Sequence, residues 1–303
     1  MPSGHSYAAP VPDHAELPDI PAALRPERVD EHRYAVTNTG DAGQRDVVFG
    51  GQLLAQAIVA ASLRHPGKHV RSIQAVFARP GRIDAPTELA IDPMHDGRSF
   101  ASDTVTAWQG DRLCARFLVL LDADEPDVVR HDVAMPRVPG PDDAAPTGPG
   151  GLVYPGAEMR IVDDVDLWNV DAPVGPAETF LWTRAASLPD TPAVHQAALA
   201  WATDGFLIGT ALRPHAGINQ DDAHRGLSTG VIAHTIVFHE PFRADEWLLL
   251  AHECPYAGRG RSFGTADVFT EDARYVASFV QTNMIRFFAD SAMADGTRYR
   301  TVM

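Results

Sequence analysis

The stretch VFHEPFRAD, residues Val237–Asp245, repeats an earlier stretch of the chain, VFARPGRID, residues Val76–Asp84. Phenylalanine, proline, arginine and aspartate recur between them at a single offset of 161 residues. The tetrapeptide GRSF follows each stretch, first at Gly97 and again 163 residues later. Self-similarity at a nearly constant offset indicates a duplicated structural unit, and it guides the fold prediction before any motif does.

Each copy carries the same order of predicted elements. In the first copy, apolar residues at helical spacing predict a helix over Val48–His65, and four strand-like stretches follow it. In the second copy, a helix is predicted over Pro192–Thr210, and strands begin near Thr229. One helix followed by antiparallel strands, twice, predicts an α+β fold. Two tandem helix-wrapped antiparallel sheets should pack as a pseudo-dimer, because each alone would leave a sheet edge open.

Stretches rich in proline, aspartate and glycine mark the predicted boundaries. The N-terminal stretch carries six prolines, which favours an extended arm over a packed element. The predicted organisation is an extended N-terminal arm (1–29), a first unit (30–121), a linker (122–177), a second unit (178–290) and a C-terminal tail (291–303).

The charge balance excludes some functions. The 303 residues include 25 Lys and Arg against 40 Asp and Glu, a formal net charge of -15, which gives no long-range attraction to nucleic acid or anionic membranes. No apolar run approaches the ~18–20 residues of a membrane span, and the polar N-terminus lacks the apolar core of a signal peptide. We therefore expect a soluble cytoplasmic protein with no nucleic-acid or membrane partner. Cys114 and Cys254 are too few for a disulfide framework and are predicted to be small buried residues.

Some motif matches favour a structural interpretation. Residues Gly260–Gly264 read GRSFG and fit the G-x-S-x-G nucleophile elbow, but the first copy has GRSF without the last glycine, and no histidine follows Ser262. A shared turn and strand start is therefore predicted. His234 and His239 are five residues apart on one predicted strand and face opposite ways, and no phosphate-binding glycine motif occurs. We expect no metal and no cofactor.

Paired glycines, Gly50 and Gly51, open the first predicted helix. They let another group approach closely, while first-turn N–H groups such as those of Gly51 and Gln52 have no intrahelical partner. Such N–H groups can stabilise an oxyanion. The alternative is that the glycines only permit close helix–sheet packing, and the sequence leaves both interpretations open.

Two polar residues stand in apolar stretches of the second copy alone. Gln281 lies where the first copy has Val119, and Asp204 lies within AALAWATDGFLIGTAL. A buried polar group without partners costs ~1–3 kcal/mol, and a buried carboxylate costs more unless it is paired. A single buried polar residue is ordinarily a core residue whose hydrogen-bonding groups have partners. Both together, in one copy only, indicate a duplicated protein that keeps one working site.

The stretches VFGGQLLAQAI, SIQAVFARPG, WATDGFL, HTIVFHEPF and VASFVQTNMIR, in this order and spacing, resemble the acyl-CoA thioesterase II family. The resemblance covers about Asp46–Leu121 and Leu199–Arg286 and implies a double hotdog fold. It also implies hydrolysis of acyl-CoA thioesters to free acid and CoA, with no metal, nucleotide or covalent cofactor. The family's catalytic Asp and Gln fall on Asp204 and Gln281, the two residues that the repeat comparison isolates.

The family's third catalytic residue, a serine or threonine, is replaced in this chain. Its position, three residues before His234, holds Val231, and the family's Asp just before that histidine is Ala233 here. Thr229, two residues earlier on the same strand face, and Thr235, four residues later, are the candidate hydroxyls, and Thr229 is favoured. The family often has a glycine after its Gln, and in this chain Asn283 stands two residues beyond Gln281.

The resemblance implies a site in which Asp204 acts as general base on a water. Gln281 and Thr229 would hold that water, and the Gly51 and Gln52 amides would stabilise the oxyanion. The acyl chain would occupy an apolar tunnel between helix and sheet, with candidate lining residues Phe49, Leu53, Trp201 and Phe206. The candidates for binding the CoA phosphates are Arg79, Arg82, Arg98, Arg259 and Arg261.

Two alternatives stay open at this point. A non-catalytic acyl-CoA-binding double hotdog protein is favoured by Val231 and Ala233. A hotdog hydratase acting on enoyl-CoA would need an Asp and a His close together on one helix, whereas His195 lies nine residues before Asp204. Exposed sheet edges and the habit of the family predict a homodimer or a higher homo-oligomer.

Overall fold

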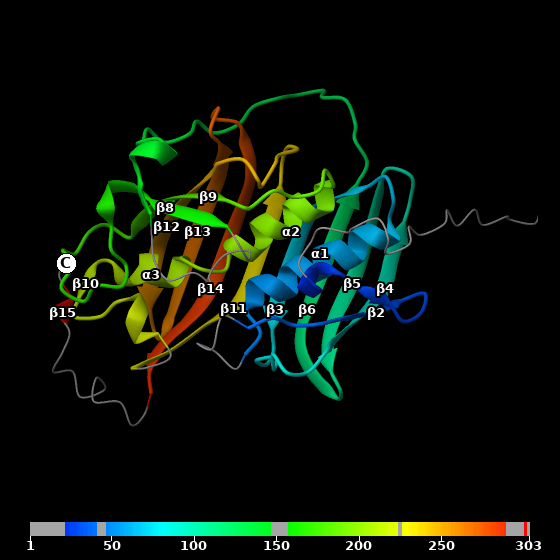
Figure 1. Ribbon diagram of the computed structural model, residues 1–303, viewed down its shortest axis with the longest axis horizontal. Coiled ribbons are helices and arrows are strands. Elements are labelled where there is room, and N and C mark those ends of the chain that lie inside the picture. The colour runs from blue at the N-terminus through cyan, green and yellow to red at the C-terminus, as the bar shows by residue number, and fades with distance from the viewer. Residues whose placement is uncertain (1–21, 41–46, 147–156, 224–225, 289–299, 302–303) are drawn as a thin grey trace, which may run out of the picture.

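The two copies meet through their own strands. β3 (His69–Phe77) of the first copy and β11 (Leu227–Phe238) of the second pair antiparallel near the centre of one 13-stranded sheet. The helices lie on one face of this sheet, with the first copy on one side of the β3–β11 pair and the second copy on the other (Figure 1). The computed structural model describes residues 22–40, 47–146, 157–223, 226–288 and 300–301.

Both copies confirm the predicted order of a helix followed by strands. The first copy contains β1 (Glu27–Arg28), β2 (Arg33–Val36), α1 (Gly50–Arg64), β3, β4 (Thr87–Asp96), β5 (Phe100–Gln109) and β6 (Arg112–Asp122). The second contains β7 (Ala145–Pro146), β8 (Glu158–Ile161), β9 (Glu178–Arg184), α2 (Pro192–Ala202), α3 (Leu207–Leu212), β11, β12 (Leu248–Gly258), β13 (Arg261–Thr270) and β14 (Tyr275–Phe287). The strand order is β1-β2-β4-β5-β6-β3-β11-β14-β13-β12-β9-β8-β7. A separate two-stranded sheet is formed by β10 (His215–Ala216) and β15 (Arg300–Thr301).

The register at the centre repeats with the offset found in the sequence. Ile73 pairs with Ile236, and Ala75 pairs with His234. Residue 73 plus 161 is 234, and residue 236 minus 161 is 75, so the second pair is the first pair with the two copies exchanged. The two halves of the sheet are therefore related by an internal two-fold pseudosymmetry.

Each copy also has a β-bulge at the same place. The register shifts between Val70 and Ser72 where β3 pairs with β6, and between Val231 and Ala233 where β11 pairs with β14. An extra residue at a bulge re-aims the neighbouring side chains, and bulges are frequent next to active sites. The bulge is thus part of the duplicated unit, and it lies close to the polar residues described below.

The helices are buried because they are covered from several sides. Residues Gly51 to Ala61 of α1 are all buried, since α1 contacts β3 and β6 on the sheet, α2 beside it, and the short 3-10 turn Ala22–Leu24. Figure 1 shows α1 and α2 side by side in front of the sheet. This arrangement brings the first turn of α1 to the C-terminal end of α2, where the site is found.

The prediction of a single helix over Pro192–Thr210 is wrong, because the structure breaks it into α2 and α3. At the break, the Thr203 hydroxyl donates to the carbonyl oxygen of Ala200 at 2.8 Å, a back-bond of the kind that bends helices. Gly205 follows and adds a residue of high backbone freedom. Asp204 therefore lies in a turn beyond α2 and not within a helix.

Part of the predicted linker belongs to the sheet. β7 pairs with β8 and β8 pairs with β9, so the second half of the sheet starts before the predicted unit boundary at residue 178. The predicted arm is packed at its end, because Ala23 and Leu24 are fully buried. Residues 1–21 of that arm, and residues 289–299 and 302–303 towards the C-terminus, lie outside the described residues.

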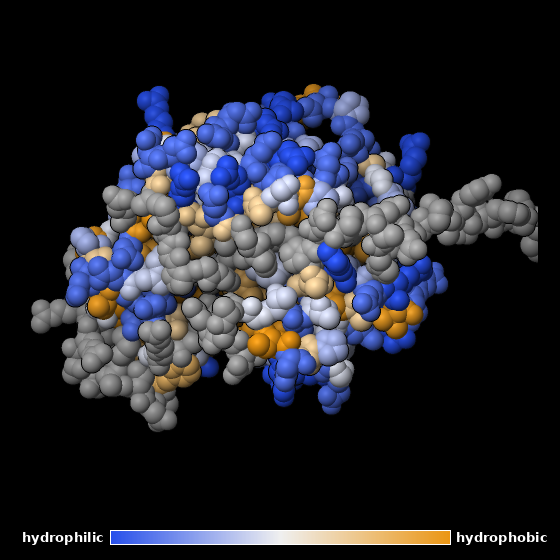
Figure 2. Space-filling view, viewed as in Figure 1, coloured by the Kyte–Doolittle hydropathy of each residue, from blue (hydrophilic) through white to orange (hydrophobic). Residues whose placement is uncertain are grey.

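Cys114 and Cys254 are free and buried, as predicted, and burial raises the pKa of both thiols. None of the helices in the described part of the chain is long and apolar enough to cross a membrane. On the face shown in Figure 2, hydrophilic side chains prevail, and the apolar side chains of the described residues form small separate groups.

A buried histidine on β12 predicts an acid-sensitive fold. His252 lies against the rings of Phe206 and Phe279, and this burial lowers its pKa from 6.5 to about 4. Between these two values the unfolded chain binds the proton more readily than the folded one, so the free energy of unfolding falls as the pH is lowered. We expect His252 to contribute a loss of about 2 kcal/mol between pH 7 and pH 5. Denaturant unfolding of wild type and His252→Leu at both pH values measures this, and an equal loss in the two proteins would contradict it.

Candidate active site

The Asp204 carboxylate joins the two copies. It projects from the turn after α2, and its Oδ2 accepts the N–H of Gly51, in the first turn of α1, at 3.0 Å. Asp204 is 8% exposed. The carboxylate thereby satisfies one of the first-turn N–H groups that a helix leaves without an internal partner. The site is thus built from the helix start of one copy and the helix end of the other.

The two glycines of α1 make this contact possible. A Cβ at Gly51 would collide with the backbone oxygen of Trp201, and a Cβ at Gly50 would lie 2.7 Å from Asp204 Oδ2. The Gly51 N–H is engaged by Asp204, and the Gln52 N–H donates to the Phe49 carbonyl at 3.1 Å. The structure therefore favours close packing, here of α1 against the end of α2. The Gly51 and Gln52 amides, predicted as oxyanion donors, already have protein partners.

A buried polar network lies beside the carboxylate. Gln281 on β14 and His234 on β11 are register partners. The Gln281 Nε2 donates to the Thr203 carbonyl at 2.8 Å and to His234 Nδ1 at 3.1 Å. Since Nδ1 accepts, the hydrogen of the neutral ring is assigned to Nε2, which donates to the Thr203 hydroxyl at 3.2 Å. The network fixes both the amide orientation of Gln281 and the tautomer of His234.

Two oxygen atoms of this cluster stay unsatisfied. Asp204 Oδ1 and Gln281 Oε1 are buried and have no hydrogen-bond partner among the described residues. Asp204 Oδ1 lies 3.5 Å from His234 Nδ1, which already accepts from Gln281. Both side chains therefore approach the same ring nitrogen. Buried acceptors without donors cost free energy, so a pair of them in a native protein needs an explanation.

The described residues of the first copy form no such network. Its equivalent register pair is Ile73 with Val119, where the second copy pairs His234 with Gln281. Both first-copy residues are buried in the main hydrophobic core. The same backbone is thus filled by apolar side chains in one copy and by polar ones in the other, which supports one working site in the described chain.

The structure does not bring Thr229 to this cluster. Its register partner is Ile285, four residues along β14 from Gln281 and therefore about 13 Å away. The hydroxyl that does belong to the network is that of Thr203, which the sequence analysis did not select. His234 was also missed as a site residue, although the comparison that isolated Gln281 would have shown a histidine where the first copy has Ile73, 161 residues earlier.

The structure also places the predicted acyl-tunnel residues and the second GRSF segment. Leu53, Trp201 and Phe206 are buried in the main core, and Phe49 packs against it, so the acyl-tunnel lining stays a prediction. The GRSF segment of the second copy begins in a turn, where Arg259 and Gly260 have positive φ, and its last three residues start β13, as predicted. Among the described residues, no group of three or more His, Cys, Asp or Glu side chains could hold a metal ion.

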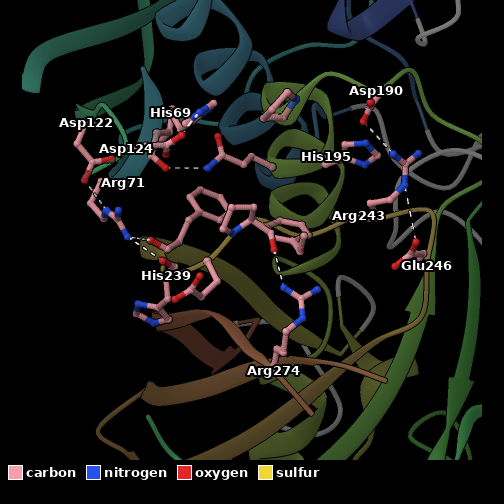
Figure 3. A pocket seen from close by; sticks show the side chains of 17 residues that line it. His69, Arg71, Asp122, Asp124, Asp190, His195, His239, Arg243, Glu246 and Arg274 are labelled. Carbon is pink, nitrogen blue, oxygen red and sulfur yellow. Dashed lines mark hydrogen bonds and ion pairs between the residues drawn. The ribbon is translucent and has the colours of Figure 1, made fainter. Parts of the chain in front are cut away.

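A cavity of about 480 Å³ lies at the other end of α2 (Figure 3). Phe238 and Pro192 are among its lining residues, and so are the acidic residues Asp122, Asp124, Asp190, Glu240 and Glu246. Phe238 is the repeat equivalent of Phe77, whose ring lies 3.1 Å from the position of a Cβ at Gly50. The cavity is therefore at the pseudosymmetric counterpart of the Asp204 site.

Two family models cover most of the chain. The acyl-CoA thioesterase N-terminal domain matches residues 38–121, and the acyl-CoA thioesterase C-terminal domain matches residues 135–285. The chain belongs to the acyl-CoA thioesterase family. As a member of the acyl-CoA thioesterase family it is a thioester hydrolase.

Individual relatives agree with this assignment. The chain is 29% identical to acyl-CoA thioesterase 2 of Haemophilus influenzae over 280 residues, which are 87% of this chain and 96% of that protein. It is 27% identical to acyl-coenzyme A thioesterase 8 of Homo sapiens, covering 79% and 80% of the two chains.

Solved structures show the same fold. An acyl-CoA thioesterase II from Mycobacterium marinum superposes with a TM-score of 0.73 at 27% identity, over 88% of this chain and 98% of that one. A hot dog fold protein from Alicyclobacillus acidocaldarius superposes with a TM-score of 0.69 at 17% identity, over 88% and 98% of the two chains. The double hotdog fold implied by the thioesterase resemblance is confirmed.

Proposed function

We propose that this family member hydrolyses acyl-CoA thioesters to free carboxylic acid and CoA, with Asp204 as general base. The observation that carries the proposal is the pair of unsatisfied acceptors, Asp204 Oδ1 and Gln281 Oε1, beside one histidine nitrogen. A water that donates one hydrogen to each oxygen keeps its lone pairs free to attack. Family membership supports the substrate class, because the related proteins carry the name acyl-CoA thioesterase.

The chemistry follows from these contacts. The water oxygen attacks the thioester carbonyl carbon while Asp204 takes one of its protons. The positive end of the α1 dipole lies beside the carbonyl and opposes the charge of the tetrahedral oxyanion. The C–S bond then breaks, and the departing thiolate recovers the proton from Asp204. Gly51 holds the base in place through its N–H, which replaces the oxyanion role first predicted for that amide.

His234 and Thr203 act in this proposal as positioning residues. Gln281 can offer its oxygen to the water only while its nitrogen is held by the Thr203 carbonyl and by His234 Nδ1. A flipped amide would set its oxygen against the Thr203 carbonyl oxygen, which is repulsive. This arrangement needs no hydroxyl at the position of Val231.

Release of free thiol from acyl-CoAs of short to long chain length tests the proposal on the wild-type protein. We expect release from at least one chain length, and the preferred length then identifies the acyl specificity. The second candidate is a non-catalytic acyl-CoA-binding protein, favoured by Val231 and Ala233 in place of the family's usual residues. Calorimetric binding of acyl-CoA without thiol release at any chain length would support that candidate and contradict hydrolysis. The homo-oligomeric assembly stays a prediction.

A further inference from the structure

We propose that Asn283 accepts a hydrogen bond from the amide N–H of the pantetheine arm of the bound thioester. This inference rests on the proposed hydrolysis of acyl-CoA and adds a binding subsite to it. Asn283 takes no part in the network that orients Gln281 and His234. It needs a role of its own, because its side chain is completely buried.

Asn283 has one satisfied and one unsatisfied end. Its Nδ2 donates to the Ser262 hydroxyl at 3.3 Å, which fixes the direction of the amide. Its Oδ1 is buried and has no hydrogen-bond partner among the described residues. Leu121 stands at the equivalent register position of the first copy and is fully buried. Asn283 is therefore a further polar residue that only the second copy places in this sheet.

The strand register places Asn283 next to the proposed reaction centre. Gln281 and Asn283 are two residues apart on β14, so their side chains share one face at a spacing of about 7 Å. The register partner of Asn283 is Val231, at the β-bulge of β11. Val231 offers no hydrogen-bonding group, so across this strand pair the Asn283 oxygen has no donor opposite it.

The direction from Gln281 to Asn283 points to the end of the molecule where α1 begins. Beyond Asn283, β14 continues to Ile285 and to the exposed Arg286. The opposite, pseudosymmetric end holds the cavity of Figure 3, whose lining includes Asp122, Asp124, Glu240 and Glu246. The equivalent positions at the α1 end hold Met284, Arg286, Arg79 and Ala85.

Two of the three cavity arginines have an arginine at the equivalent position of the α1 end, whereas Arg71 is replaced there by Ile232. Arg274 donates to the Pro241 carbonyl at 3.1 Å, and its equivalent Arg112 donates to the Pro80 carbonyl at 3.2 Å. Arg243 and its equivalent Arg82 are the second retained pair, and the α1 end also has arginine where the cavity has Asp124 and Glu240. In a chain with a net charge of -15, this is the end that favours the CoA phosphates. Asn283 then lies on the thiol side of the thioester and not on the acyl side.

The chemistry of that side supplies the donor. In a CoA thioester, two methylene groups separate the sulfur from the first amide N–H of the pantetheine arm. With the carbonyl carbon beside Asp204 and Gln281, an extended arm brings this N–H to the next inward-facing residue along β14. Every acyl-CoA carries it, so the contact recognises the thiol portion whatever the acyl chain.

Thioesters of two truncated thiols test the inference, both with the acyl group that wild type prefers. N-acetylcysteamine keeps the amide N–H, and 2-acetoxyethanethiol replaces it by an ester oxygen. We expect wild type to favour the amide thioester about fivefold to tenfold in kcat/KM, the worth of one hydrogen bond. In Asn283→Leu, which installs the residue of the first copy, this ratio should fall to about one. Asn283→Ala serves the same purpose if the leucine variant does not fold.

A matched control separates binding from packing. Ser262→Ala removes the hydrogen bond at the nitrogen end of Asn283 but leaves Oδ1 available, so it should keep the amide preference even if the rates change. An unchanged ratio in both Asn283 variants would overturn the inference while leaving the proposed function standing. Failure of wild type to release thiol from either thioester and from acyl-CoA would contradict the proposed function itself.

Discussion

Asp204→Asn is expected to lower kcat for acyl-CoA hydrolysis by about 10²–10⁴-fold, the usual contribution of a positioned general base. The substitution is nearly isosteric, and the amide oxygen can still accept the N–H of Gly51, the bond that joins the two copies at 3.0 Å. The amide cannot take a proton from water. Activity should therefore fall while the fold persists, and thiol release measured beside thermal unfolding checks both statements.

The control for this variant is a carboxylate outside the site. Asp142 has a side chain that is 97% exposed and pairs only at the surface with Arg160. Asp142→Asn changes the net charge by the same amount and should leave kcat unchanged. An Asp204→Asn protein that unfolds like wild type and keeps more than a tenth of its activity would remove Asp204 from the mechanism.

The duplication explains why so much of the fold could be predicted from sequence. Strands β3 to β6 are local patterns of apolar and turn residues, and the second copy repeats them with a nearly constant offset. The same comparison isolated Gln281, since Val119 stands at the equivalent register position. A single-copy protein would have offered no internal reference, and a buried glutamine would have had no special meaning.

The missed features depend on contacts that no local pattern reports. The Gly51–Asp204 hydrogen bond joins residues 153 apart in the chain, so the sequence could not decide between the two interpretations of the glycine pair. The break after α2 arises from the Thr203 back-bond and Gly205, within a stretch that is otherwise typical of a helix. Thr229 was predicted on the correct buried face, but distance along the strand separates it from Gln281.

Transplanting the first-copy pair, as His234→Ile with Gln281→Val, is expected to abolish most activity in a chain that still folds, with a smaller loss of stability than the two single variants add up to. The variant installs the residues found at the equivalent positions, Ile73 and Val119, which the first copy buries on the same backbone. It removes the Gln281 oxygen that helps hold the water, so kcat should fall about 10²-fold or more. Thiol release and denaturant unfolding of the double variant and both single variants measure the two effects.

The single variants show why the pair must be exchanged together. Gln281→Val leaves the Thr203 carbonyl and His234 Nδ1 without their donor, and His234→Ile leaves the Thr203 hydroxyl without its own. Each unsatisfied group costs about 1–3 kcal/mol. The double variant still leaves the Thr203 carbonyl and hydroxyl without these donors but no longer contains His234 Nδ1, so it should be more stable than the sum of the single losses predicts. Strictly additive losses would mean that the network is not a coupled unit, and full activity in the double variant would mean that it does not serve catalysis. The expected outcome, low activity on an intact fold, would show that the second copy retains its buried polar residues for chemistry and that the fold itself is satisfied by the apolar residues of the first.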